Sequence, residues 1–90
     1  MKTRPNQLVL IEWEDSYGCS SRWQDIDSAA TPRALLCRSV GWIIARTKKC
    51  VVLVPHLADG ETKQGCGDMT IPTACIVRTT PLQERGTKRA

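Results

Sequence analysis

The sequence predicts an all-β protein that folds as one small barrel. Along its 90 residues, short runs of β-branched and apolar residues alternate with segments rich in Gly, Ser, Asp and Lys, which is the spacing of successive antiparallel strands. The most informative run is Met69–Val77, where an apolar strand end, a proline, a short turn and a second β-branched strand follow one another. A connection of this kind is typical of small barrels, whose closure removes exposed sheet edges.

The first predicted strand is Gln7–Glu14. Its apolar residues fall on both faces until Glu12, so its first half should be buried on both sides. The segment Asp15–Arg22 then has the composition of a loop, because Ser and Asp side chains bond to nearby backbone and glycine tolerates positive φ. The next strand pattern begins at Ala34, which makes this first loop long.

The second predicted strand is Ala34–Thr47, with a helix as the rival interpretation. Gly41 among β-branched neighbours and the absence of helix caps favour a strand that bends or bulges near that glycine. Lys48 and Lys49 form a polar turn into Cys50–Leu57, which has the strongest strand pattern in the chain. These two strands should pair as a hairpin.

The remaining pattern completes five strands. Ala58–Gly67 contains three glycines and several charges, which predict a mobile loop. The fourth strand is Asp68–Ile71, a 3₁₀ turn follows at Pro72–Ala74, and Cys75–Thr80 is the fifth strand. Five strands, a long first loop, a central hairpin and a 3₁₀ turn before the last strand predict an SH3-like barrel. An OB-type barrel is the alternative, but it requires longer strands and a helix between the third and fourth.

The barrel should occupy residues 7–80 as one domain, between a flexible segment at 1–6 and a basic flexible tail at 81–90. Within residues 5–82 eight basic residues match eight acidic ones, so the net charge of +4 comes from the two ends. Five cysteines without a C-x-x-C pair indicate reduced, mostly buried thiols rather than a disulfide framework. The first apolar run is too short for a signal peptide or a membrane span, so we expect no membrane association.

The sequence contains no complete catalytic or metal-binding signature. Its one histidine, His56, follows Pro55 at the end of an apolar strand and has no motif partner, which favours a structural role. The cysteines lack the short spacings that pre-position zinc ligands. Acidic residues concentrate around the first loop, but Glu12 and Glu14 share one strand face, which is typical of a solvated surface. We therefore expect neither an enzyme nor a bound cofactor.

The aromatic residues are the main candidates for recognition. The chain has three tryptophans, one tyrosine and no phenylalanine, and Trp and Tyr are enriched at binding surfaces because each has an apolar body and a polar end. Trp42 shares a strand face with Val40 and Ile44, which predicts a core position, whereas Tyr17 and Trp23 belong to the long loop. The candidate partner-binding residues are Asp15, Tyr17, Arg22, Trp23 and Trp42.

A nucleic-acid-binding barrel is an alternative from another functional class. The basic residues available to it are Arg46, Lys48 and Lys49 near the hairpin turn and Lys88 and Arg89 in the tail. The neutral charge balance of the body argues against a dedicated phosphate-binding face. Nucleic acid is therefore a less favoured partner than a protein or a nucleotide.

Several short segments form a further pattern. They are Trp13-Glu14-Asp15-Ser16, Trp23, Arg38-Ser39-Val40-Gly41-Trp42, and Ile71-Pro72 with Ile76. With these segments the chain resembles a group of short bacteriophage proteins that share a W-x-D-S … W … S-V-G-W/F … I-P-x-x-x-I pattern, over roughly residues 8–78. The resemblance implies a viral accessory protein made in the cytoplasm of the host bacterium, and it carries over no catalytic residue. The cysteine content and the basic tail depart from the pattern.

These observations lead to a non-enzymatic phage binding module that acts on a host component, and inhibition of a bacterial defence system is its concrete form. Such an inhibitor would bind a host protein through a patch around Trp23 and Tyr17. Alternatively, it would sequester a nucleotide signal by pairing subunits and stacking a base on an aromatic side chain beside Arg or Lys. Oligomerisation would also help a chain with a small core. A structural virion or head–tail component is a third alternative.

Overall fold

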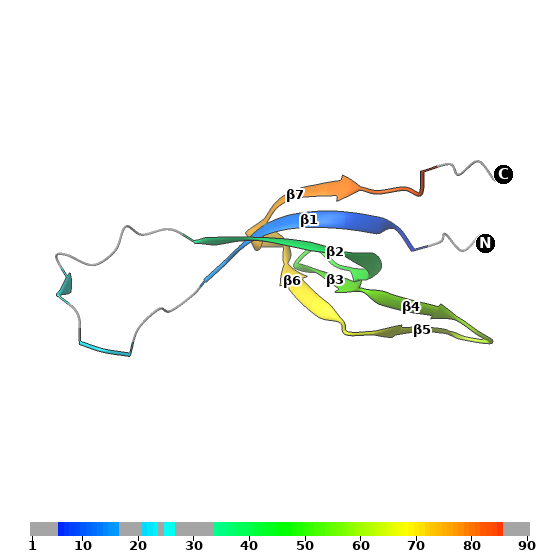
Figure 1. Ribbon diagram of the computed structural model, residues 1–90, viewed down its shortest axis with the longest axis horizontal. Coiled ribbons are helices and arrows are strands. Elements are labelled where there is room, and N and C mark those ends of the chain that lie inside the picture. Colours follow the sequence, from blue (N-terminus) through cyan, green and yellow to red (C-terminus); the bar gives the residue numbers. More distant parts are fainter. Residues whose placement is uncertain (1–5, 17–20, 24, 27–33, 86–90) are drawn as a thin grey trace.

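The computed structural model shows an antiparallel five-stranded sheet from which a two-stranded hairpin extends (Figure 1). It describes residues 6–16, 21–23, 25–26 and 34–85. In chain order the elements are β1 (Leu8–Asp15), β2 (Leu35–Arg46), β3 (Cys50–Val54), β4 (His56–Asp59), β5 (Lys63–Cys66), β6 (Met69–Pro72), the 3₁₀ turn η2 (Thr73–Cys75) and β7 (Ile76–Pro81). The large sheet has the order β6-β3-β2-β1-β7, and β4 pairs with β5.

The all-β class, the five-stranded sheet and the 3₁₀ turn before the last strand are confirmed. The predicted hairpin is also confirmed, because the second half of β2 pairs with β3. Thr47 shapes the turn between them: its Oγ1 accepts hydrogen bonds from the backbone N–H groups of Lys49 and Cys50, each at 3.1 Å. β6 and β7 are the two outer strands, and the described residues show no pairing between them, so the sheet is not closed.

The segment Ala58–Gly67 corrects the predicted mobile loop. β4 and β5 pair antiparallel along their whole length, and the single strand predicted over Cys50–Leu57 is divided at Pro55, which has no N–H to donate to a ladder. Nearly every residue of this hairpin is exposed. Because neither face is buried, no apolar alternation marks the strands, and the sequence pattern misses them.

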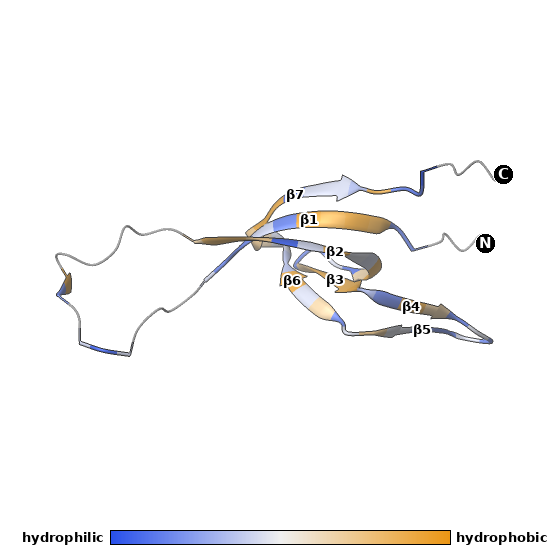
Figure 2. Cartoon of the chain, viewed as in Figure 1, coloured by the Kyte–Doolittle hydropathy of each residue, from blue (hydrophilic) through white to orange (hydrophobic). Residues whose placement is uncertain are grey.

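The core lies on one face of the sheet. Its buried residues are Val9, Ile11, Val51, Leu53 and Ile71, with Trp13, Ile43 and Ile76 packed against them. Figure 2 shows the hydrophobic first half of β1, whose alternate residues enter this core. The partly buried Trp13 is fixed by a hydrogen bond that its indole Nε1 donates to Ser39 Oγ at 3.0 Å. The cluster is small, and burying each of its larger side chains contributes about 1.5–3 kcal/mol.

The predicted core position of Trp42 is wrong, and so is the face of β2 from which it was inferred. Val40 and Ile44 are exposed and Trp42 is only half buried. The register explains the difference, because the buried Val9 lies opposite Gly41 across the β1–β2 ladder. The side of β2 that faces the core is therefore the one with small residues.

At Gly41 the strand β2 approaches the end of β3 closely. A Cβ built on it would lie 2.7 Å from the backbone oxygen of Val54, a separation that real Cβ atoms do not show. The predicted bend or bulge near this glycine is confirmed by a register shift between Ile43 and Ala45 in the β2–β3 pairing. The absent side chain at Gly41 thus allows the end of β3 to pack against β2.

The end of the last strand and the burial of the cysteines both differ from the expectations. β7 reaches Pro81, and the backbone N–H of Leu82 donates to Leu8 O at 2.9 Å, so hydrogen bonding continues just beyond the predicted domain boundary. The four described cysteines, Cys37, Cys50, Cys66 and Cys75, are free, and none is fully buried, contrary to the expected burial. Within the described residues, no helix has the length and apolar character that crossing a membrane requires.

A substitution at Gly41 tests the close approach of β2 and β3. We expect Gly41→Ala to lower the free energy of unfolding by about 1–3 kcal/mol, because its methyl group would overlap the Val54 carbonyl. Gly60→Ala is the matched control: its nearest heavy atom would lie 3.6 Å away, and we expect a change within about 0.5 kcal/mol. Urea unfolding curves measure both, and equal effects of the two substitutions would contradict the packing described.

Candidate partner-binding surface

One end of the sheet holds most of the predicted partner-binding residues. Asp15 is the last residue of β1 and lies opposite Leu35, the first residue of β2. Arg22 and Trp23 belong to the segment that joins these strands, and Figure 1 shows its described part projecting beyond the sheet, on the side away from β4 and β5. Tyr17 lies outside the described residues. Asp15, Arg22 and Trp23 therefore lie at, or project beyond, the same end of the β1–β2 strand pair.

The first loop exposes two large apolar side chains. Trp23 is fully exposed, with an accessibility of 102%, and Ile26 is 87% exposed. Large apolar side chains usually lose most of their surface on folding, and an exposed tryptophan is of the residue type most enriched at interface hot spots. We call Trp23 and Ile26 the first-loop surface.

Three apolar residues at this end were missed by the sequence analysis. Ile26 stands among polar residues, and Leu35 and Leu36, each about half exposed, begin β2. A signal was present for the two leucines, because consecutive residues of a strand point to opposite faces and both faces cannot be the core face. Ile26 carried a weaker signal, which was its isolation in a polar loop.

Trp42 lies apart from the other candidates. It pairs with Leu8 at the opposite end of β1 from Asp15, and a separation of seven strand residues corresponds to about 23 Å. Trp42 lines a cavity of about 400 Å³ beside the β4–β5 hairpin, together with His56, Gln64 and Cys66. The structure thus does not bring Trp42 into one site with Trp23.

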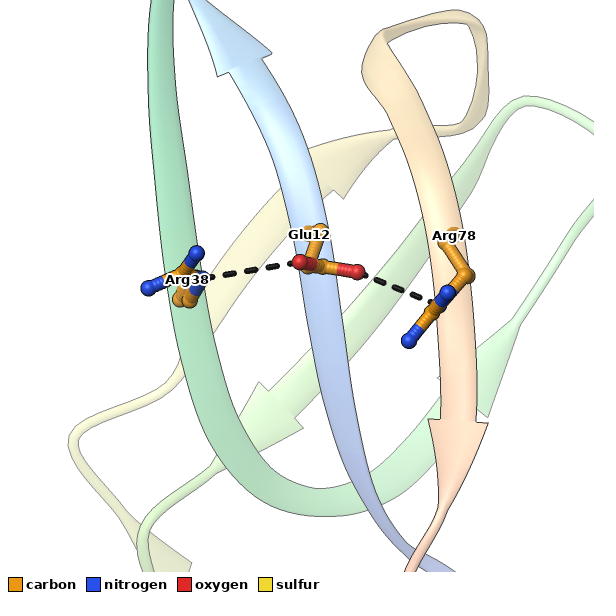
Figure 3. Close-up of polar contacts among 3 residues, drawn as sticks. All are labelled: Glu12, Arg38 and Arg78. Carbon is orange, nitrogen blue, oxygen red and sulfur yellow. Dashed lines mark ion pairs between the residues drawn. The ribbon is translucent and has the colours of Figure 1, made fainter.

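A charged cluster crosses the sheet on the face away from the core. Glu12 of β1 lies opposite Arg38 of β2 and Arg78 of β7. Its two carboxylate oxygens form ion pairs with the arginines, Oε1 at 3.5 Å from Nε of Arg38 and Oε2 at 3.2 Å from Nε of Arg78 (Figure 3). The Glu12 side chain is 19% exposed, whereas both arginine side chains are about 70% exposed. Two cations therefore share one anion, and the cluster has a net positive charge.

The basic residues of the nucleic-acid alternative are partly brought together. Arg46, Lys48 and Lys49 are all exposed and lie at the turn between β2 and β3. Lys88 and Arg89 lie outside the described residues. Three cations at one turn can contact a phosphate group, but they do not form an extended track along which a backbone could bind.

The described residues contain no cluster of three or more His, Cys, Asp or Glu side chains that could hold a metal ion. His56 is exposed and lies directly opposite Cys66 in the β4–β5 ladder. A nucleophile and base pair needs a third group to orient the base.

Comparison with known protein families, curated proteins and solved structures finds no match. The described surface presents exposed apolar and exposed cationic side chains that are available for recognition.

A double-mutant cycle tests the Glu12 cluster. We expect Glu12→Gln combined with Arg78→Gln to give a coupling energy of about 0.2–1 kcal/mol, because the Arg78 side chain is mostly exposed to solvent, and we expect added salt to reduce it. The matched cycle of Glu14→Gln with Arg78→Gln should give a coupling near zero, since Glu14 shares the face without an ion pair in the described residues. Thermal unfolding measures both cycles, and equal couplings would contradict the assignment.

Proposed function

We propose that this chain is a non-enzymatic binding module that recognises a partner protein through the first-loop surface. The observation that carries the proposal is the nearly complete exposure of Trp23 and Ile26. Burying a side chain of this size contributes about 1.5–3 kcal/mol, and tryptophan is the residue type most enriched among interface hot spots. Folding does not bury these two side chains, so the free energy of burying them is available when a partner binds.

A protein is a better partner for Trp23 than a nucleotide. Small ligands bind in concave sites that bury most of their surface, whereas Trp23 is exposed on all sides. A projecting aromatic side chain fits a pocket on another protein, in the manner of an anchor residue. The nucleotide-sequestering alternative has less support for this reason.

The architecture supports an SH3-like barrel as the finer description of the fold. The sheet order β6-β3-β2-β1-β7 places the last strand beside the first, and η2 separates β6 from β7. β2 is shared between two halves of the sheet, which curves around the core. Small barrels of this kind present their long loops as binding surfaces on a rigid body.

We further propose that the chain is a phage accessory protein that acts on a host component in the bacterial cytoplasm, with inhibition of a defence system as its concrete role. The resemblance to short phage proteins supports this proposal. Several residues that carry the resemblance have a structural explanation here: Trp13 bonds Ser39, Gly41 permits the close approach of β3, and Ile71 is fully buried. Trp23 has no such explanation, which favours a role in binding.

Substitution of Trp23 tests the proposed function. We expect Trp23→Ala to reduce partner capture from bacterial lysate at least tenfold, as the loss of a hot-spot residue does, and to leave the melting temperature unchanged because the side chain is exposed. Val77→Ala is the control, since Val77 is an exposed apolar residue on β7 and outside the first loop.

Captured material is identified by mass spectrometry before and after nuclease treatment. A protein retained by the wild type and by Val77→Ala, but not by Trp23→Ala, supports the proposal. Equal capture by all three chains contradicts it. Capture that disappears with nuclease would instead favour the nucleic-acid alternative through Arg46, Lys48 and Lys49.

A further inference from the structure

The first half of β2 has a neighbouring strand on one side only. Leu35–Trp42 pairs with β1, but pairing with β3 begins at Trp42 and continues toward Arg46. Beyond Val54 the chain enters Pro55 and then β4, which pairs with β5 instead. The described part of the chain therefore places no strand along the second side of Leu36–Val40.

The hydrogen-bonding groups on that side can be assigned. Ile43 donates its N–H to Gln7 O at 2.9 Å, so its backbone groups point toward the β1 side. Successive residues of a strand point their N–H and C=O groups to opposite sides, and the β1–β2 register is continuous. The backbone groups of Leu36, Arg38 and Val40 thus point to the open side. We call these three residues the β2 edge.

An apolar cavity lies at one end of the β2 edge. Its volume is about 220 Å³, and its lining residues are Ser39, Val40, Leu53, Pro55, Gly67 and Met69. Two of them, Leu53 and Met69, lie opposite each other in the β3–β6 ladder. A strand that paired with the β2 edge would direct the side chain opposite Ser39 to the same face as Ser39, toward this cavity. One aliphatic side chain would suit a cavity of this composition.

The outward face of the β2 edge has a defined chemistry. Leu36 and Val40 are 54% and 55% exposed, and Arg38 lies between them. The ion pair with Glu12 uses Nε of Arg38, and 70% of the Arg38 side chain is exposed. A guanidinium group has five N–H donors, so Arg38 can bind a second carboxylate.

We propose that the β2 edge binds an extended segment of the partner protein, which adds to the sheet as an antiparallel strand. This inference rests on the proposed function of protein binding and names how the partner is held. The bound segment has an apolar residue opposite Val40, a larger apolar residue directed to the cavity, an acidic residue opposite Arg38 and an apolar residue opposite Leu36. Backbone hydrogen bonds hold the segment, and the cavity and Arg38 select its sequence.

Charge argues for a different chain as the occupant rather than a second copy. A two-fold pairing of two β2 edges that used all three residues would place Arg38 directly opposite Arg38 of the second copy. Like charges directly opposite each other destabilise a strand pair. An acidic segment removes this repulsion, since it brings a carboxylate to the net positive cluster of Glu12, Arg38 and Arg78.

The test uses a fluorescent peptide with blocked ends that contains Val-Leu-Glu-Thr-Val, the order in which an antiparallel strand meets Val40 through Leu36. We expect binding by fluorescence anisotropy below about 1 mM, and about threefold weaker binding when Lys replaces Glu, the size typical of an exposed charge pair. N-methylation of Glu should abolish binding, because its N–H faces β2. N-methylation of Leu should be tolerated, because its N–H points away.

Protein variants separate this inference from the proposed function. Arg38→Gln should remove the preference for Glu over Lys while the chain stays folded, as circular dichroism checks, and Trp23→Ala should leave peptide binding unchanged. Absence of binding, or equal effects of the two N-methyl groups, would overturn the strand-addition proposal and leave the Trp23 result standing. A dimer in size-exclusion chromatography that the peptide dissociates would also overturn it, because the occupant would then be a second copy.

Discussion

The close approach of the Val54 carbonyl to Gly41 determines how the sheet is arranged, because it brings the end of β3 against the middle of β2. Any side chain at Gly41 would occupy the same space as that carbonyl. β2 can therefore pair with β1 through its first half and with β3 through its second half. A register shift follows within three residues and increases the local twist. Gly41 thus allows the β1–β2 pairing and the β2–β3 pairing to share one core.

The same arrangement explains why so few residues form the core and why so much apolar surface is left over. The core-facing side of β2 consists of small residues at its centre, so β1, β3 and β6 supply the bulk. The larger residues of β2 consequently fall on the outer face, where Leu36 and Val40 are half exposed. In a domain of this size the surface that the core cannot use is available for recognition. The β2 edge lies outside the core for this reason.

Much of the fold could be predicted from local patterns. Local sequence patterns located β1, β2, β3, β6 and β7, and Gly41 indicated the bend. The hairpin of β4 and β5 could not be predicted, because an element exposed on both faces has no apolar period. The core position of Trp42 was wrong because a strand with apolar residues on both faces does not reveal which face is buried until its register with β1 is known. Trp23 was correctly placed on the surface by its loop context, whereas Ile26 and the Glu12 cluster required the structure, since cross-strand partners far apart in the sequence have no local signature.

Amide hydrogen exchange along β2, followed by NMR, tests most directly whether the strand is shared between two halves of the sheet. The account predicts alternation in the first half: the amides of Leu36, Arg38 and Val40 exchange at least about tenfold faster than those of Cys37, Ser39 and Gly41, because only the latter are bonded to β1. At Trp42 and Ile43, where β3 pairs on one side of the strand and the β1 side is still bonded, both neighbouring amides should be protected. Uniform protection from Leu36 to Val40 would show that another strand covers this side of β2, and it would contradict the account.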